Sequence, residues 1–176
     1  MYTTPGIHVR QAGLQDADVL VSFSAAMARE TENRHLDLVR LQNGTRALLA
    51  ASERGFFIVA EHHKGGLRRP VGQLMITFEW SDWRNGTFWW VQSVYVDPAW
   101  RRRGVYRSMY GHIVSKAKAD PAVCGIRLYV EQNNQAAQSV YQRVGLAPTG
   151  YWVYEQDFVL GVQPFSKLNR ETKEQT

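Results

Sequence analysis

Residues 93–106 read Ser-Val-Tyr-Val-Asp-Pro-Ala-Trp-Arg-Arg-Arg-Gly-Val-Tyr and carry the strongest signal for the fold. The first part of this stretch, Val94 to Val96, is β-branched and aromatic, which is typical of a strand. Asp97-Pro98 ends this strand, because proline lacks the N–H that a ladder needs and restrains the residue before it. We expect a helix to begin near Arg102, so the stretch predicts a strand, a charged turn and a helix start.

The turn between these two elements holds the densest cluster of positive charge in the chain. Four arginines surround Gly104, namely Arg101, Arg102, Arg103 and Arg107. Free backbone N–H groups and the positive end of the helix dipole face outward at a helix start, and a glycine lets an anion approach the backbone. The pattern predicts a phosphate-binding turn, and a solvated arginine cluster is the alternative reading.

Toward the N-terminus, hydrophobic periodicity and turn signals predict four strands and two helices. Asn85-Gly86 is the strongest hairpin signal, and a Gly-rich loop at His63 to Gly66 separates two further strands. Three consecutive antiparallel strands are therefore expected. In chain order we expect a strand over Ile7 to Gln11, a helix to about Glu30, a helical pattern over Leu36 to Leu49 broken at Asn43-Gly44, and strands over Gly55 to Ala60, Val71 to Glu79 and Thr87 to Val96.

Toward the C-terminus, the pattern predicts a strand–helix–strand crossover, which would make one parallel pair of strands. The helix has an apolar face formed by Val105, Met109, Ile113 and Ala117, and it stops at Asp120-Pro121. The elements expected after it are a strand over Gly125 to Val130, a helix capped by Asn134 with Ala137, Val140, Tyr141 and Val144 on one face and a stop at Gly145, and a last strand over Tyr151 to Val159.

The length of 176 residues fits one domain, expected over residues 1–160, with a polar tail over residues 161–176. The predicted fold class is α/β in the α+β sense, with a mixed, mostly antiparallel sheet of six to seven strands and about four helices. One cysteine, Cys124, cannot form an internal disulfide, and neither a targeting segment nor a long apolar run is apparent. We therefore expect a cytoplasmic protein with no membrane partner. The net charge of +5 permits an anionic partner, but it is too small to make nucleic acid the expected one.

Two motifs in order give the sequence a resemblance to a known family. Residues 93–106 resemble the central Gln/Arg-x-x-Gly-x-Gly/Ala motif, with its preceding strand, of the GNAT family of N-acetyltransferases. A second segment, Asn134-x-x-Ala137-x-x-Val140-Tyr141-x-x-x-Gly145-Leu146, is similar to the family's Asn-x-x-Ala-x-x-Leu-Tyr-x-x-x-Gly-Phe. The chain departs from the pattern at Tyr106, where glycine or alanine is usual, and at Leu146. The resemblance is strongest over Thr87 to Glu155 and implies the fold of that family.

The resemblance implies acetyl-coenzyme A as the acetyl donor, bound where the fourth and fifth strands splay apart. Its pantetheine arm would pair with the backbone of Val94 and Val96 like an added strand, and Asn134 would hydrogen-bond the arm. Its pyrophosphate would lie on the turn. The residues that the resemblance assigns to the cofactor are Val94, Tyr95, Val96, Arg101, Arg102, Arg103, Gly104, Val105, Tyr106, Arg107, Ser108, Asn134 and Tyr141.

Tyr141 is the family's usual group for protonating or hydrogen-bonding the departing thiolate. A phenol of pKa about 10 does not fully protonate a thiolate whose thiol has a pKa of about 8.5, so a strengthening hydrogen bond is the expected role. An alkylamine acceptor of pKa about 10.4 must lose a proton before it attacks. Glu79 is the first candidate base and Glu131 the second, with a surface carboxylate as the alternative for each. Asp82 and Gln92 are candidate substrate contacts.

Aromatic side chains gather before and within residues 93–106. They are Trp80, Trp83, Trp89, Trp90 and Tyr95. Strand alternation predicts Trp89 and Tyr95 on one sheet face and Trp90 and Gln92 on the other. Either they form an acceptor pocket or a cage for a cation, or they pack in the core or at a dimer interface. Three acids near the first two helices favour a cationic or amine acceptor: Glu30, Glu32 and Asp37.

The predicted function is an acetyl-coenzyme A-dependent N-acetyltransferase in which an amine of unknown identity attacks the thioester directly in a ternary complex. Two alternatives remain at this stage. One is a non-catalytic module that binds or senses coenzyme A, and the other is a domain that binds nucleic acid through the arginine cluster. No metal is expected, because the five histidines show no metal-ligand spacing. A homodimer would suit the antiparallel strands and the tryptophans.

Overall fold

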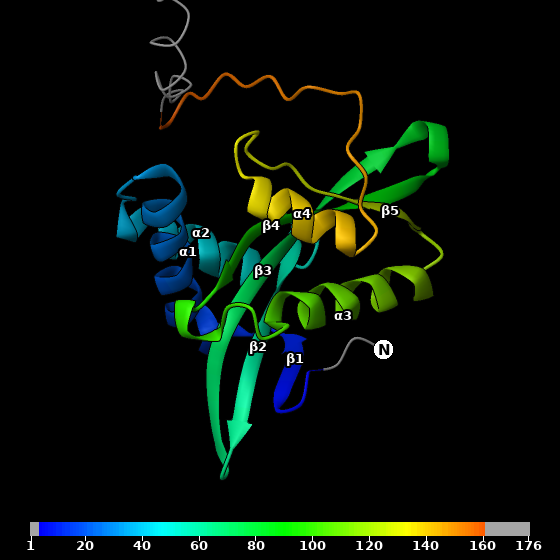
Figure 1. Ribbon diagram of the computed structural model, residues 1–176. Helices are drawn as coiled ribbons and strands as arrows, with labels where there is room; N and C mark the ends of the chain where they lie inside the picture. Colours follow the sequence, from blue (N-terminus) through cyan, green and yellow to red (C-terminus); the bar gives the residue numbers. More distant parts are fainter. Residues whose placement is uncertain (1–3, 161–176) are drawn as a thin grey trace, which may run out of the picture. The chain divides into compact units, whose positions relative to one another are not determined.

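The computed structural model describes residues 4–160. The chain divides into two units, Met1–Gly145 and Leu146–Thr176. Every helix and strand of the described residues lies in the first unit (Figure 1). None of the helices formed within residues 4–160 has both the length and the apolar character needed to cross a membrane. The predicted polar tail, residues 161–176, lies outside the described residues.

The first unit is built on a five-stranded sheet with the strand order β1-β2-β3-β4-β5. Neighbouring strands from β1 to β4 pair antiparallel, and β4 and β5 form the parallel pair that the crossover predicts. The strands are β1 (Ile7–Gln11), β2 (Gly55–Lys64), β3 (Leu67–Ser81), β4 (Gly86–Val96) and β5 (Val123–Arg127). The helices are α1 (Ala17–Glu32), α2 (Leu38–Leu49), α3 (Val105–Ala119) and α4 (Gln135–Arg143), with short 3-10 turns η1 (Leu14–Asp16), η2 (Asp82–Arg84) and η3 (Pro98–Trp100).

The predicted mixed sheet with four helices is confirmed, whereas the predicted number of six to seven strands is wrong. The expected last strand, Tyr151 to Val159, forms no strand in the described residues, and the side chains of Tyr151 and Tyr154 are 83% and 92% exposed. Alternation of residue types marks a strand only when a neighbouring backbone supplies the ladder partners. The fifth strand is also shorter than expected, because it ends at Arg127.

Helix α2 runs without a break through Asn43-Gly44, where the sequence indicates an interruption. Its start is capped by Asp37, whose Oδ1 accepts hydrogen bonds from the amides of Val39 and Arg40. The helix packs against α1 and β2, and Thr45 is buried there. A glycine inside a helix costs about 1 kcal/mol relative to alanine, which the cap and the packing offset.

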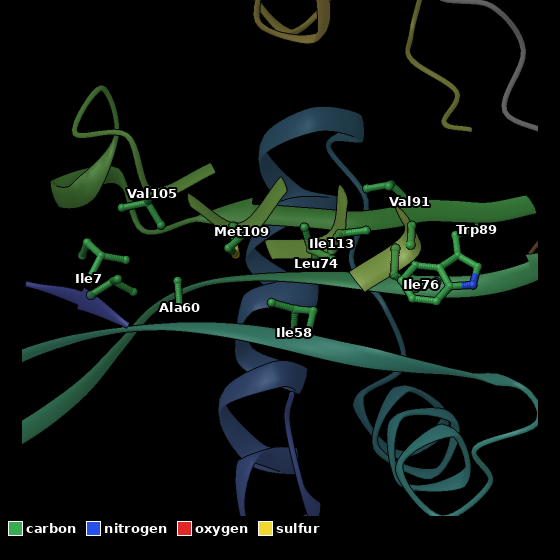
Figure 2. Packing of buried hydrophobic residues seen from close by; sticks show 12 residues of the cluster. Ile7, Ile58, Ala60, Leu74, Ile76, Trp89, Val91, Val105, Met109 and Ile113 are labelled. Atoms are coloured by element: carbon green, nitrogen blue, oxygen red, sulfur yellow. The ribbon is translucent and has the colours of Figure 1, made fainter. Parts of the chain in front are cut away.

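Helices cover both faces of the sheet, with α1 and α2 on one side and α3 on the other (Figure 1). Alternation along β2 explains how both layers are held. Ile58 packs in the cluster that includes Met109 of α3 (Figure 2), whereas Phe57 and Val59 pack against Leu20 of α1. A fully buried aliphatic side chain of this kind contributes roughly 1.5–3 kcal/mol, so the sheet is fixed firmly between its two helical layers.

Strand β4 carries a bulge at Ser93. On the neighbouring strand, Gln73 pairs with Tyr95 and Met75 pairs with Gln92. Two steps along β3 therefore match three steps along β4, so β4 holds one extra residue. Ser93 has a φ of 49°, in the left-handed region that an extended strand does not use. An inserted residue of this kind bends the strand and changes which side the following side chains face.

The bulge overturns the expected facing of the aromatic side chains. Trp89 lies in the core cluster beneath α3. Tyr95 lies on the opposite face, where its ring centroid is 5.3 Å from that of Phe23 in α1. The prediction that Trp89 and Tyr95 share a face is wrong, because one extra residue between them shifts a period-two pattern by one step.

Candidate functional site

Strands β4 and β5 diverge next to the bulge. Their parallel ladder ends at the pair Trp90 and Arg127, where β5 stops, while β4 continues to Val96. Within the part of the chain that the structure describes, the β4 edge from Val91 onward has no strand beside it on this side. Such an edge presents backbone N–H and C=O groups to an extended ligand, which can add to it like a further strand.

The turn that follows β4 alternates in backbone conformation. Arg102 has a φ of 61° and Gly104 a φ of 78°, with Arg103 at negative φ between them. Turns of this alternating kind direct successive N–H groups into one concavity that suits an anion. Side chains other than glycine rarely adopt positive φ, and such strain clusters at functional sites. The arginine run gave no local signal that Arg102 takes this conformation.

The start of α3 adds further unpaired donors to the turn. The first helical hydrogen bond runs from the Ser108 amide to the Gly104 carbonyl at 2.9 Å. Among residues 4–160, the amides of Gly104, Val105 and Tyr106 meet no acceptor. The first turn of α3 holds no acidic side chain, so no carboxylate offsets the positive end of the helix dipole. The predicted phosphate-binding residues therefore form a contiguous donor surface.

Thr4 packs against this helix start. Its hydroxyl donates to the Gly104 carbonyl at 3.3 Å and accepts a hydrogen bond from the Ser108 hydroxyl at 3.0 Å. Ser108 is buried, and its hydroxyl is already engaged by this hydrogen bond with Thr4. A Cβ atom added to Gly104 would lie 2.6 Å from the Thr4 Oγ1, so residue 104 must be a glycine for packing as well as for its positive φ.

Arg101 joins the end of β4 to α1. Its Nε donates to the Val96 carbonyl at 2.9 Å, and its guanidinium pairs with the carboxylate of Glu30. The Tyr95 hydroxyl donates to the other Glu30 oxygen at 3.0 Å. Burial, and after it this hydrogen bond, raises the pKa of Tyr95 above its ordinary value. The network links Tyr95 and Arg101, which were predicted to contact the cofactor, to Glu30, which was predicted to lie near the acceptor. No local sequence signal indicated this network.

The remaining two arginines of the run differ in their surroundings. The Arg103 guanidinium lies over the Trp100 ring, 5.2 Å from its centroid. Arg102 is exposed and has no ion-pair partner among the described residues. Arg102 is therefore the arginine of the run whose charge is least committed to the protein.

Tyr141 of α4 lies beside the start of α3. Its ring centroid is 5.7 Å from that of Tyr106, which in turn stacks on Tyr110 at 5.9 Å. Burial raises the pKa of Tyr141, and burial followed by the neighbouring tyrosines raises that of Tyr106. The Tyr106 hydroxyl is buried with no hydrogen-bond partner among the described residues. The departure from the family motif at Tyr106 thus places a ring between α3 and α4 and not in the predicted anion-binding turn of residues 101–104, called the anion turn below.

Asn134 caps α4 as the sequence predicts, with its Oδ1 accepting from the Ala137 amide at 3.0 Å. The side-chain amide nitrogen of Asn134 has no acceptor among the described residues and remains a donor for a ligand. Glu131 shapes the turn before this helix, because its carboxylate accepts from the side chain and the amide of Asn133 at 2.8 and 3.1 Å. Glu131 follows β5 by four residues, so it does not end that strand as expected.

Glu79 lies on β3, where it pairs with Phe88 of β4, the strand that in turn pairs with β5. One carboxylate oxygen accepts from Arg127 of β5 at 2.8 Å, and the other accepts from the indole N–H of Trp90. The Arg127 guanidinium also lies over the Phe88 ring at 3.7 Å. Both Glu79 oxygens are therefore engaged, and neither contacts the anion turn or α4.

The tryptophan cluster separates into different environments. Trp80 and Trp83 are 62% and 85% exposed near the β3–β4 connection, whereas Trp89 is in the core. They do not form one cage. The expected substrate contacts are also engaged locally: Asp82 accepts from the Trp83 amide, and Gln92 donates to Thr77.

The two other predicted acids act within the protein. Asp37 caps α2, as described above, and Glu32 lies 4.0 Å from Arg34. Glu32 therefore has a cation at the limit of ion-pair distance, whereas Asp37 is exposed and bonds backbone amides through one oxygen only. Among the described residues no group of three or more His, Cys, Asp or Glu could hold a metal ion.

Comparisons with solved structures reveal a shared fold. A possible acetyltransferase from Clostridium difficile 630 is 37% identical, covers 87% of this chain and 98% of its own, and superposes with a TM-score of 0.79. A structure described as a predicted acetyltransferase with acetyl-CoA, from Clostridium acetobutylicum, is 18% identical, covers 85% and 96% of the two chains, and has a TM-score of 0.68.

A third neighbour is AAC(6')-Iy in complex with the bisubstrate analogue CoA-S-monomethyl-acetylneamine. It is 14% identical, covers 86% of this chain and 97% of its own, and has a TM-score of 0.65. At these low identities, the second and third neighbours show the fold alone. A search of curated proteins gave no match.

The family model for the acetyltransferase (GNAT) family matches residues 20–146, which include the divergent strands, the anion turn, Asn134 and Tyr141. The resemblance of the two motifs is thereby confirmed over most of the chain. The geometry of the site and this match lead to the same result: the chain belongs to the GNAT acetyltransferase family.

Proposed function

We propose that the protein transfers the acetyl group of acetyl-coenzyme A to an amine by direct attack in a ternary complex. The observation that carries this proposal is that an open strand edge leads directly into an anion-binding turn on one continuous piece of chain. A ligand with an extended amide-bearing arm and a pyrophosphate fits both features at once. The family membership and the neighbour with acetyl-CoA support the same cofactor.

In this proposal the pantetheine arm pairs with β4 near Val94 and Val96, and the Asn134 amide donates to it. The pyrophosphate lies on the amides from Arg102 to Arg107, and the Arg102 side chain meets an outer phosphate. Arg101 keeps its link to Glu30, so its part is to hold the strand end and not to bind phosphate.

The chemistry requires the acceptor nitrogen to attack the thioester carbon while the C–S bond breaks. A backbone amide at the β4 bulge stabilises the developing oxyanion, and the Tyr141 hydroxyl donates a hydrogen bond to the departing sulfur. The amine reaches its neutral form by losing one proton to a base through water. After attack, it loses the second proton, which ends on the thiol of coenzyme A. Holding both reactants in line supplies much of the rate.

Glu79 and Glu131 remain the proposed routes for removing the amine proton. Glu79 is held by Arg127 and Trp90, and Glu131 is held by Asn133, so each would act through a water molecule and not by direct contact. A rate that is unchanged in Glu79→Gln and in Glu131→Gln would exclude both and leave solvent as the base.

The first test is calorimetric binding of acetyl-coenzyme A to the native chain and to Arg102→Gln. We expect micromolar binding that weakens about tenfold in the variant, because one charge-assisted phosphate contact is lost. Arg102 is exposed, so the change leaves the fold intact. Gly104→Glu is a poorer variant, because its side chain would displace Thr4 whether or not a phosphate binds.

Arg54→Gln is the matched control, since Arg54 is exposed in the turn before β2, away from the site. It should bind acetyl-coenzyme A as tightly as the native chain. Absence of binding by the native chain would contradict the proposal. Binding without thiol release for any amine would favour the non-catalytic coenzyme A-binding alternative.

A further inference from the structure

A cavity of about 300 Å³ lies between α1, α2 and the sheet, on the face opposite α3. Ser93, the bulge residue of β4, is part of its lining. The cavity therefore reaches the strand position beside which the cofactor arm is proposed to end. Its volume is at the lower end of the range of small-molecule pockets, which suits a compact acceptor and not a large polyamine.

Most of the cavity wall is apolar. The apolar residues come from every surrounding element: Met27 from α1, Leu36 from the connection between α1 and α2, Leu48 from α2, and Phe57 and Met75 from β2 and β3. These residues would hold an aliphatic or aromatic group by the hydrophobic effect. A strongly hydrated polycation would lose its water in such a cavity without gaining ion pairs.

A polar corner lies at the Ser93 side of the cavity. Gln73 is fully buried, and its Nε2 donates to the Ser24 hydroxyl at 2.9 Å and to the Ser93 carbonyl at 3.3 Å. Both of these partners line the cavity. The Gln73 Oε1 has no hydrogen-bond partner, and the Ser24 hydroxyl proton meets no acceptor among residues 4–160. Gln73 itself does not line the cavity, so the Ser24 hydroxyl is the side-chain group of this corner that can donate a hydrogen bond to a small polar group in the cavity.

Arg40 is the charged residue among those that line the cavity. Arg40 is exposed on α2 and has no ion-pair partner among the described residues. None of the described residues that line the cavity is Asp, Glu or His. The cavity thus offers a cation to a ligand and no carboxylate, which is the reverse of what an ammonium-rich acceptor needs.

From these features, and resting on the proposed acetyl transfer, we infer that the acceptor is a free α-amino acid with an apolar side chain. The α-carboxylate pairs with Arg40, the side chain packs on the apolar wall, and the α-amine lies at the Ser93 corner facing the thioester. The nitrogen forms an amide bond to the acetyl carbon, the C–S bond breaks, and the products are the N-acetyl amino acid and coenzyme A with a free thiol.

The ease with which the amine loses its proton supports the same class of acceptor, because Glu79 and Glu131 are each held by other residues and act only through water. An alkylamine of pKa about 10.4 is almost wholly protonated near pH 8, whereas a peptide α-amine has a pKa of about 7.7–8.0. A neighbouring carboxylate stabilises the ammonium of a free amino acid, and pairing that carboxylate with Arg40 weakens this effect. Arg40 then has two roles: it binds the acceptor carboxylate, and it lowers the pKa of the acceptor amine.

The test measures thiol release from acetyl-coenzyme A with L-phenylalanine, L-methionine and L-leucine. The comparison acceptors are phenethylamine, L-phenylalaninamide and neamine. We expect kcat/KM for the apolar amino acids to exceed that for each comparison acceptor by at least tenfold. A comparable or higher value for phenethylamine, the amide or neamine would overturn the inference, because none of them carries the carboxylate.

Arg40→Gln should lower kcat/KM for L-phenylalanine about tenfold, chiefly through KM, and should shift the pH–rate profile toward higher pH. Its activity on phenethylamine, which carries no carboxylate for Arg40 to bind, should not fall. Arg46→Gln is the matched control on the same helix, because Arg46 pairs with Asp18 and does not line the cavity. Equal behaviour of the two variants would contradict the role of Arg40.

Calorimetry with acetyl-coenzyme A, run on the same preparations, distinguishes a failure of the proposed acetyl transfer from a failure of the acceptor assignment. A native chain that does not bind the cofactor defeats the proposed function itself. A chain that binds the cofactor and releases thiol with a comparison amine, but with no amino acid, defeats the acceptor assignment alone.

Discussion

Tyr141 shows how a side chain's surroundings limit the chemistry assigned to it. Its ring lies between α4 and the start of α3 against Tyr106, and burial raises its pKa above the ordinary value of about 10. The phenol therefore stays protonated through the neutral range. It can donate a hydrogen bond to a thiolate, but full proton transfer to sulfur is even less favourable than for an exposed tyrosine.

Tyr141→Phe is expected to lower kcat for thiol release by about 100-fold, the effect typical of removing one donor to a developing charge. The dissociation constant for acetyl-coenzyme A should stay the same, because the ring and its packing remain. Steady-state kinetics between pH 6 and 9 check this, and the shape of the profile should match that of the native chain. Tyr110→Phe is the control within the same cluster. Equal kcat values for Tyr141→Phe and the native chain would remove Tyr141 from the mechanism.

At the scale of elements, glycine has opposite effects on stability inside α2 and at the start of α3. Gly44 lies inside α2, where an added Cβ atom meets nothing within 4 Å. Gly104 precedes α3 with a positive φ, and an added Cβ atom there meets Thr4 at 2.6 Å. The helix start depends on its glycine, whereas the helix interior would be more stable without one.

Gly44→Ala should therefore stabilise the fold by about 1 kcal/mol, which corresponds to a rise in Tm of about 2–4 °C for a chain of this size. Thermal unfolding followed by circular dichroism measures it. Gly104→Ala is the comparison, and its Tm should fall, because alanine is strained at that φ and crowds Thr4. A fall in Tm for Gly44→Ala would show that α2 is not continuous through this position.

At the scale of the whole molecule, an ion-pair network closes the β1 edge of the sheet. Arg10 of β1 makes two hydrogen bonds of 2.7 Å to Asp16 of η1 and also bonds Glu61 of β2, which accepts from His63 as well. The hydrogen bonds from Arg10 lower the pKa of Asp16. Burial alone would raise the pKa of Glu61, but the hydrogen bonds from Arg10 and His63 lower it overall.

Arg10→Gln should lower the free energy of unfolding by about 2 kcal/mol at pH 7, because two buried carboxylates lose their cation; the partial exposure of Arg10 keeps the loss below that of a fully buried pair. Both carboxylates have lowered pKa values in the folded state. Their contribution is present above the unfolded values of 3.8 and 4.5 and is lost as the pH falls through the folded values.

Urea unfolding of both chains from pH 7 down to pH 3 checks this expectation. The native chain should lose stability toward acid more steeply than Arg10→Gln, since the variant lacks the interaction that protonation removes. Arg68→Gln, an exposed change on β3, serves as the control. Parallel pH curves for the native chain and Arg10→Gln would show that the network adds nothing to stability.

Local sequence signals were enough to predict the order of the elements up to α4, the parallel pair and the charged turn before α3. Each of these rests on local physics. Proline at position 98 stops a strand, Asn134 caps a helix, and a four-residue spacing of apolar side chains makes the buried face of α3. The motif resemblance likewise rested on two short segments, residues 93–106 and 134–146, and the family match confirmed it.

The assembly of the site could not be predicted in this way, because it depends on contacts between distant parts of the chain. The bulge at Ser93 turned Tyr95 toward α1, and Arg101 was tied to Glu30 of that helix. The cavity beside Ser93 exists because α1 and α2 pack together over the sheet. Strand register and helix packing depend on residues far apart in the chain. The period of two residues in a strand or of 3.6 in a helix tells which side chains share a face. Which neighbouring element that face contacts depends on the folded chain.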